Sequence, residues 1–253
     1  MRATFLAHSG FLIEWEHFYT LFDFYQGELP ELSPDKPLLV FVSHRHEDHF
    51  DSRIFAIPQM HDCTFYYLSR DTSIAVRHRE QYGLTEDVAA RITKLRPDEI
   101  FVGEVAGKRL VVRTIRSTDI GVAFLLSCEG KLVYHAGDLN WWHWTSEGKT
   151  YVKHMAQIYQ EAIGKLAKAV RAEAEDGNSP PEIALAMVPL DPRLEDGYAM
   201  GLDHILDNVA VQHVLPMHMW EKFEIIDRYC KEHPQWAEKI LHIRHNGQEF
   251  TVD

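Results

Sequence analysis

Three histidines and one aspartate lie within six consecutive positions of this 253-residue chain, as His44, His46, Asp48 and His49. Imidazole nitrogens and carboxylate oxygens are donors that zinc, manganese and iron accept in proteins. Side chains two residues apart point the same way in extended backbone, so His44 and His46 can contact the same ion. The spacing therefore predicts a metal centre built around this motif.

A short apolar segment must position these donors. Residues 38–42, Leu-Leu-Val-Phe-Val, follow a Lys-Pro pair and directly precede the polar motif, which is typical of a buried strand. The donors then lie where a rigid strand opens into a loop, so the start of that loop is held in place. A helix is expected directly afterwards, with Asp51 or Ser52 as its N-cap.

One loop cannot enclose an ion, so further donors are expected elsewhere in the chain. Residues 132–138 form an apolar segment that ends in Gly137 and Asp138, where the glycine permits a tight turn and the aspartate is presented at a strand end. Residues 214–218 form a second such segment, which ends in His218. Each signal is weak alone, but together with the first motif they predict Asp138 and His218 as metal ligands.

Taken together, these residues resemble the metallo-β-lactamase superfamily of metal-dependent hydrolases. Its pattern is an early Asp, His-x-His-x-Asp-His, a middle His, Gly-Asp and a late His, and the matching residues here are Asp23, His44, His46, Asp48, His49, Asp138 and His218. Residues 5–13, FLAHSGFLI, also resemble the first hairpin of the branch that contains the L-ascorbate 6-phosphate lactonase. The resemblance implies an α/β (α+β) fold, a four-layer αββα sandwich, as a single domain over residues 1–253.

The middle histidine of the superfamily pattern is missing from this chain. No histidine occurs between His78 and His135, and the matching segment offers Ser117 or Asp119 near that place. The resemblance implies one complete set of metal ligands, which consists of Asp48, His49, Asp138 and His218. It also implies a second set that lacks one ligand, which consists of His44, His46 and Asp138. We therefore expect one ion to be held firmly and a second weakly or not at all, unless Asp119 or His143 replaces the missing ligand. Zinc is the expected ion, with manganese or iron as alternatives.

The resemblance implies hydrolysis of a small anionic substrate, a lactone or an ester, by a metal-activated water. Catalytic roles are expected for Asp48, which can orient the water or take its proton, and for His143, which could bind substrate, donate a proton or cap its loop. A phosphodiesterase is one alternative, and a non-catalytic metal-binding protein is another because the middle histidine is absent. A di-iron redox protein is disfavoured, since such members have Glu where this chain has His46.

Other residues near the motifs are expected to support the site or contact the substrate. Asp23 is predicted to hold the ligand loop by hydrogen bonds, and His8 either does the same or is a buried structural histidine. Arg193 follows a predicted strand and can reach an anionic group of the substrate. The three indoles that follow Asp138 form either a pocket wall or a core cluster, and they belong to Trp141, Trp142 and Trp144.

Charge and cysteine content narrow the class of protein. The net charge is −12, from 38 acidic and 26 basic residues, which argues against nucleic-acid binding but not against a small anionic substrate near a metal. The three cysteines are few and far apart, so reduced thiols in the cytoplasm are expected. No apolar run has the length of a membrane span or the form of a signal peptide, so no membrane association is expected. Homo-oligomerisation stays open.

Hydrophobic periodicity predicts the remaining elements. Strands are expected over residues 3–6, 11–15, 19–22, 111–115, 122–126, 131–134 and 183–188. A long helix is expected over residues 149–174, because apolar side chains recur along one of its faces. Shorter helices are expected over residues 202–210 and 222–231, and residues 176–181 are expected to form a loop.

Overall fold

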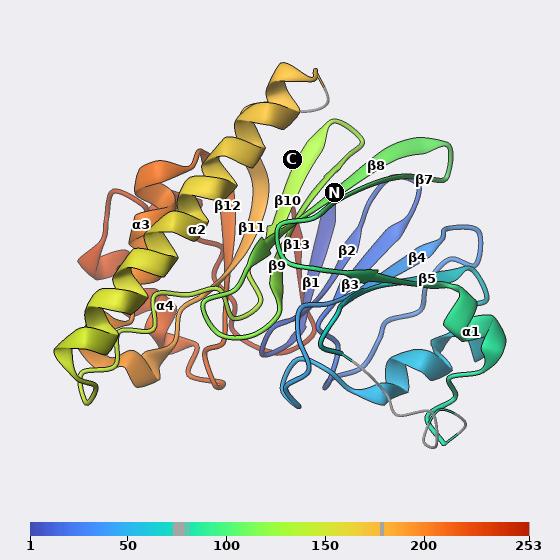
Figure 1. The fold of residues 1–253 in the computed structure, drawn as a ribbon, viewed down its shortest axis with the longest axis horizontal. Coiled ribbons are helices and arrows are strands. Elements are labelled where there is room, and N and C mark those ends of the chain that lie inside the picture. The colour runs from blue at the N-terminus through green and yellow to red at the C-terminus, as the bar shows by residue number, and fades with distance from the viewer. Residues whose placement is uncertain (73–78, 80, 178–179, 253) are drawn as a thin grey trace.

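The computed structural model describes residues 1–72, 79, 81–177 and 180–252. Two β-sheets pack face to face, and helices cover the outer face of each sheet (Figure 1). The layers therefore run helix, sheet, sheet, helix, which confirms the predicted αββα sandwich. Residues 178–179 of the predicted loop lie outside the described residues, and the single-domain assignment stays a prediction.

The first sheet contains the N-terminal half of the chain and the last strand, in the order β13-β1-β2-β3-β4-β5-β6. Pairing is antiparallel from β13 to β3 and parallel from β3 to β6. Its strands are β1 (Arg2–Ala7), β2 (Gly10–Glu14), β3 (Tyr19–Phe22), β4 (Leu38–Val42), β5 (Thr64–Ser69), β6 (Ile92–Leu95) and β13 (Gln248–Thr251).

The second sheet has the order β12-β11-β10-β9-β8-β7. Pairing is parallel from β12 to β10 and antiparallel from β10 to β7. Its strands are β7 (Ile100–Val105), β8 (Lys108–Arg116), β9 (Val122–Cys128), β10 (Lys131–His135), β11 (Ile183–Pro189) and β12 (Val211–Met217).

Helices on both sides cover the apolar outer faces of the sheets (Figure 1). The second sheet is covered by α2 (Lys149–Glu175), α3 (Met200–Asn208) and α4 (Glu224–Glu232), with the 3-10 helices η3 (Pro192–Gly197) and η4 (Ala237–Lys239) between and after them. The first sheet is covered by α1 (Glu86–Ala90) and the 3-10 helix η1 (Ser52–Gln59). No helix among the described residues is long and apolar enough to cross a membrane.

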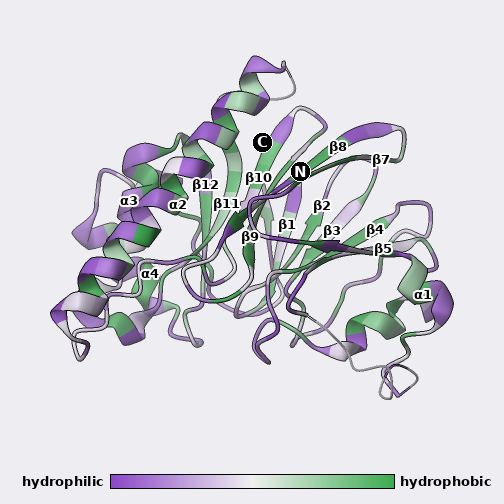
Figure 2. Ribbon diagram, in the orientation of Figure 1, coloured by the Kyte–Doolittle hydropathy of each residue, from purple (hydrophilic) through white to green (hydrophobic). Residues whose placement is uncertain are grey.

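The strand β4 shows why a continuous apolar run forms a strand in this fold. Leu39 and Phe41 enter the core between the sheets, whereas Leu38, Val40 and Val42 enter the core beneath η1 and α1. A strand that is buried on both faces needs apolar side chains at every position. Figure 2 shows the same division in the whole molecule, with hydrophobic strands inside and hydrophilic faces on the outer helices.

Most predicted elements agree with the structure within a few residues, but the short helix α1 was not predicted, and three of the four unpredicted strands lie at sheet edges. The helix predicted after the ligand loop is the 3-10 helix η1, and the carboxylate of Asp51 accepts a hydrogen bond from the backbone N–H of Arg53 at its start (2.7 Å). Four strands were not predicted, namely β5, β6, β7 and β13. The side chains of β7 and β13 are largely exposed or half-buried, so their sequences lack the apolar signal of an inner strand.

Candidate metal centre

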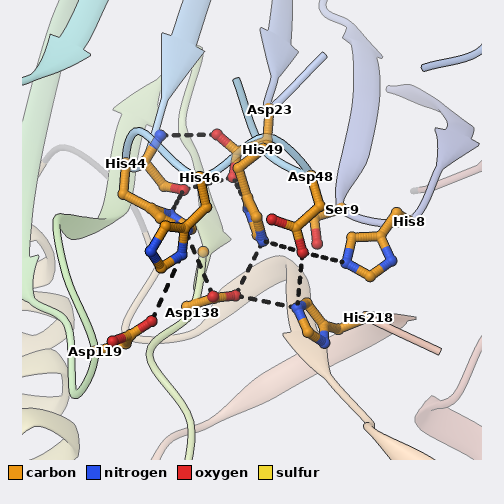
Figure 3. Close-up of polar contacts among 12 residues, drawn as sticks. His8, Ser9, Asp23, His44, His46, Asp48, His49, Asp119, Asp138 and His218 are labelled. Atoms are coloured by element: carbon orange, nitrogen blue, oxygen red, sulfur yellow. Dashed lines mark hydrogen bonds and ion pairs between the residues drawn. The ribbon is translucent and has the colours of Figure 1, made fainter. Parts of the chain in front are cut away.

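The predicted ligands come together because several strands end at the same place (Figure 3). The loop after β4 carries His44, His46, Asp48 and His49, and the ends of β10 and β12 supply Asp138 and His218. A strand end is a rigid origin for a ligand, since the ladder of backbone hydrogen bonds fixes its direction. These residues define the candidate metal centre.

The centre contains two neighbouring groups of donor atoms, which share one aspartate. We name Asp48, His49, Asp138 and His218 the inner position, and His44, His46 and Asp138 the outer position. Oδ1 of Asp138 lies 3.0 Å from Nε2 of His49 and 3.4 Å from Nε2 of His218. Its other oxygen, Oδ2, lies 3.4 Å from Nε2 of His44, which is 3.0 Å from Nδ1 of His46. Asp138 therefore presents one oxygen to each position.

The donors of the inner position fit a divalent cation. Nε2 of His49, Nε2 of His218 and Oδ1 of Asp138 are buried, and none of them makes a hydrogen bond of normal geometry with the described residues. Buried polar atoms without partners are costly, at roughly 1–3 kcal/mol each. Their separations of 3.0–3.4 Å are close to the edge of a tetrahedral zinc site, which is about 3.4 Å for donors about 2.1 Å from the ion. A bound cation would satisfy all three atoms together.

Asp23 holds the ligand loop, as predicted, and it is completely buried. Its Oδ1 accepts the backbone N–H of Ser43 (2.7 Å), and its Oδ2 accepts the Ser43 hydroxyl (2.6 Å). The same Oδ2 lies 2.8 Å from Nδ1 of His49. An N–H at Nδ1 that donates to Asp23 leaves Nε2 of His49 as the donor atom for a metal.

Asp191 does the same for His218, a role that its place in the sequence did not predict. Its Oδ2 lies 2.8 Å from Nδ1 of His218. Burial opposes ionisation of Asp191, but hydrogen bonds from His218 and Arg193 lower its pKa to about 2. The only sequence signal is an aspartate two residues after the strand β11, a position that is also typical of a turn.

His49 binds a proton strongly in the metal-free protein. Burial disfavours its charged form, but the carboxylates of Asp138 and Asp23 raise the pKa of His49 to about 10. The ring is therefore protonated at neutral pH, and Nε2 must lose its proton before it can bind a metal.

We therefore expect a metal ion that binds at pH 7 to release about one proton from the inner position. Titration calorimetry with Zn²⁺ in buffers of different ionisation enthalpy measures this number directly. The apparent affinity should also increase as the pH is raised from 6 to 8. An observed heat that does not depend on the buffer would contradict this prediction.

His8 lies at the inner position rather than behind it. Its side chain is almost completely buried, and its Nε2 lies 3.4 Å from Oδ2 of Asp48. This Nε2 and donor atoms of Asp48, His49 and His218 all lie within 4.8 Å of one another. The backbone N–H of His218 donates to the carbonyl of His8 (3.1 Å), which ties the β1–β2 hairpin to the end of β12. The structure thus brings His8 among the donors, as a residue that can orient Asp48.

The two candidates for the missing ligand lie in different places. Oδ2 of Asp119 lies 3.7 Å from Nδ1 of His46, whereas Ser117 is buried and its hydroxyl accepts the backbone N–H of Asp119 (3.2 Å). His143 is not among the residues that line the cavity or the grouped donor atoms, and it lies at Gly197, where an added Cβ would be 3.1 Å from Cβ of His143. The catalytic role of His143 stays a prediction.

A cavity of about 330 Å³ opens beside both metal positions. Asp48, Asp119, Asp138 and His218 line it together with four aromatic side chains. The aromatic residues that line it are Trp142, Trp144, Tyr151 and Trp220, of which Tyr151 and Trp220 were not predicted to do so. The indole of Trp141 packs instead on Tyr159, with 5.7 Å between ring centroids. Trp142 and Trp144 therefore follow the predicted alternative of a pocket wall, and Trp141 follows that of a core cluster.

Arg193 also lines this cavity and is connected to the candidate metal ligand His218 through Asp191. Its Nε and Nη2 donate to the carboxylate of Asp191, at 3.0 and 2.6 Å. Its guanidinium lies over the ring of Trp220, with 4.4 Å to the centroid. A chain of contacts therefore leads from the cavity wall through Arg193 and Asp191 to His218.

The fold and the site together define a metal-dependent hydrolase of the αββα class. Comparison with protein families matches residues 2–155, more than half of the chain, to the beta-lactamase superfamily domain. The chain belongs to this superfamily, and membership supports metal-dependent hydrolysis in general. A comparison with curated proteins finds no match.

Several solved structures share the fold at low sequence identity. The metallo hydrolase Igni18 from the archaeon Ignicoccus hospitalis is 16% identical, with a TM-score of 0.54 and coverage of 100% of this chain and 99% of that one. The isothiocyanate hydrolase from Delia radicum gut bacteria is 12% identical, with a TM-score of 0.53 and coverage of 100% and 99%. CmlA, a diiron β-hydroxylase from Streptomyces venezuelae, is 9% identical, with a TM-score of 0.60 and coverage of 99% of this chain and 54% of that one. At these identities the similarity shows the fold alone.

Proposed function

We propose that this protein is a metal-dependent hydrolase whose substrate is a small anionic lactone or ester. Zinc is the proposed divalent ion. The observation that supports this function most is the convergence of three buried donor atoms on His49, Asp138 and His218 beside a cavity of about 330 Å³, none of which makes a hydrogen bond of normal geometry with the described residues. The resemblance of residues 5–13 to the lactonase branch supports the choice of substrate, since His8 of that hairpin lies at the inner position.

The inner position would hold the ion through His49, Asp138, His218 and Asp48. A divalent ion supplies a nucleophile by lowering the pKa of a water molecule toward neutrality. Burial opposes ionisation of Asp48, but His8 and His49 lower the pKa of this carboxyl, so it stays ionised at neutral pH. Asp48 also lines the cavity, and can therefore accept a proton at a carboxylate oxygen, with Nε2 of His8 3.4 Å from its Oδ2.

The other residues that line the cavity fit an anionic substrate with an apolar part. Two nitrogens of Arg193 bind Asp191, which leaves Nη1 for an anionic group of the substrate. The indoles of Trp142 and Trp144 stack in parallel, 6.2 Å apart, and offer apolar faces beside it. In a chain of net charge −12, Arg193 and the metal would supply local positive charge for such a substrate.

We propose further that the partner is a small molecule and not a nucleic acid, because the chain is strongly acidic. Cys63, Cys128 and Cys230 are free thiols, which supports a cytoplasmic setting.

A screen of the Zn²⁺-loaded protein tests the proposed reaction. The panel consists of lactones, carboxylate-bearing esters, bis-phosphodiesters and thioesters, with metal content measured in the same samples. We expect turnover of lactones or esters that disappears when the metal is chelated. Stable metal without turnover of any compound would favour the non-catalytic alternative, and turnover of phosphodiesters alone would favour a phosphodiesterase.

Replacing Arg193 by glutamine should weaken the binding of anionic substrates selectively. A charge-assisted hydrogen bond contributes about 1.5–3 kcal/mol, so KM for a carboxylate-bearing ester should rise roughly 10–100-fold. KM for the matched neutral ester should change little. Arg45→Gln is the control, because Arg45 is exposed and does not line the cavity. Equal losses on both esters would mean that Arg193 acts only by holding Asp191.

A further inference from the structure

The outer position has fewer protein donors than the inner one. His44, His46 and Oδ2 of Asp138 are the donor atoms gathered there, and a tetrahedral site with an open coordination place for water or substrate needs three. Because Asp138 would bind an ion at each position, the negative charge of its carboxylate would be shared between the two ions. A further side-chain donor on the open side would complete the outer position.

We infer that Asp119 is this donor, so that the outer position binds a second ion through His44, His46, Asp119 and the shared Asp138. The inference rests on the proposed metal-dependent function. Oδ2 of Asp119 lies 3.7 Å from Nδ1 of His46 (Figure 3), but Asp119 is not part of the group in which the donor atoms of His44, His46 and Asp138 lie within 4.8 Å of one another. Its half-exposed side chain would therefore turn toward Asp138 when it completes a site with edges of about 3.4 Å. Asp119 and His46 both line the cavity, and their side chains are 44% and 45% exposed, so an ion there would face the substrate.

The loop that carries Asp119 is tied to the segment of the bridging ligand. Residues 117–121 connect β8 to β9, and the backbone N–H of Asp119 donates to Oγ of Ser117 (3.2 Å). The hydroxyl of Thr118 donates to the carbonyl of Asn140 (2.6 Å), two residues after Asp138. These hydrogen bonds therefore fix the loop that carries Asp119 relative to the segment that carries Asp138.

The same loop also contacts the segment that carries His44. The backbone N–H of Val122 donates to the carbonyl of Ser43 (3.0 Å). Gly121 approaches that carbonyl so closely that an added Cβ would lie 2.1 Å from it. The loop is thus fixed on both sides of the outer position, and its conformation directs Asp119 toward His46.

A carboxylate in place of an imidazole reduces the margin by which the outer position prefers Zn²⁺ over Mn²⁺. Two imidazoles and two carboxylates form a harder and more negative donor set than three imidazoles and one carboxylate. Carboxylate ligands suit Mn²⁺, whereas imidazole ligands suit Zn²⁺. The outer ion would also be more exposed than the inner one, so we expect it to be held more weakly and to exchange first.

Two substitutions with opposite expected effects test this inference, with binding as the readout. Equilibrium dialysis with elemental analysis measures Zn²⁺ and Mn²⁺ bound per chain over a range of free ion concentrations. The wild type should bind two ions, one of them more weakly. Asp119→Ala should weaken that second ion at least about tenfold, whereas Asp119→His should tighten Zn²⁺ at the same position and reduce the share of Mn²⁺.

Glu47→Ala is the matched control, because it removes the same charge from an exposed residue of the ligand loop. It should leave both binding steps unchanged, and thermal unfolding should show that all variants are folded. The inference is overturned if Asp119→Ala binds both ions like the wild type, if Asp119→His weakens Zn²⁺ as alanine does, or if the wild type binds only one ion. A wild type that binds no ion at all would overturn the proposed function as well.

Discussion

Replacing Asp138 by alanine should abolish both metal retention and hydrolysis. One carboxylate oxygen faces the inner position and the other faces the outer position, so the substitution removes a donor from both. It also leaves the protonated His49 without its main counter-charge. Loss of the ion removes several kcal/mol of transition-state stabilisation, so turnover should fall by at least about 10³-fold.

Metal content and turnover of the Asp138→Ala variant should be measured beside those of Asp196→Ala, which removes an exposed aspartate. His218→Ala should show the same loss of the inner ion as Asp138→Ala. If both ligand variants retain their metal at the wild-type level, the assignment of these residues as ligands is wrong.

Replacing Gly121 by alanine should strongly destabilise the fold around the site. Gly121 has a φ of +74°, and an added Cβ would lie 2.1 Å from the Ser43 carbonyl and 2.5 Å from Cβ of His44. The left-handed backbone costs about 1–2 kcal/mol for a non-glycine residue, and forced overpacking costs about 1–3 kcal/mol. The free energy of unfolding should therefore fall by about 2–5 kcal/mol.

Gly107→Ala separates these two causes. Gly107 has a φ of +72°, and no atom lies within 4 Å of an added Cβ. Only the backbone cost applies there, so the loss should be about 1–2 kcal/mol. Denaturation by urea measures both variants, and equal losses would mean that the contact of Gly121 with the ligand loop is not tight.

The elements that could be predicted carry a strong apolar pattern, on both faces in a strand such as β4 and on one face in the helix α2. The strand β4 is apolar at every position, and the helix predicted over residues 149–174 is observed as α2 over Lys149–Glu175. The strand β13 could not be predicted, since its exposed residues carry little pattern. It pairs with the other end of the chain, where Arg2 is opposite Thr251. Such pairing depends on the tertiary fold and leaves no local signal.

The candidate site also contains residues whose roles depend on the tertiary fold and leave no local signal in the sequence. The ligands were predictable because their residue types and spacing are unusual, whereas Asp191 resembles any aspartate in a turn until the fold places it against His218. Trp220 lies in a left-handed backbone conformation, with φ of +54°, which no neighbouring residue predicts. His143 is close to Asp138 in sequence, but the turn between them directs it toward Gly197. Proximity along the chain was therefore not sufficient to place a residue at the site, since Trp142 and Trp144 line the cavity and His143 between them does not.

Anomalous diffraction at the zinc edge, from crystals of the Zn²⁺-loaded protein, tests the central claim most directly. We predict a strong peak within about 2.0–2.2 Å of Nε2 of His49, Nε2 of His218 and Oδ1 of Asp138. A well-ordered structure with those three atoms in place and no peak between them, or with its only peak elsewhere, would contradict the proposed metal centre.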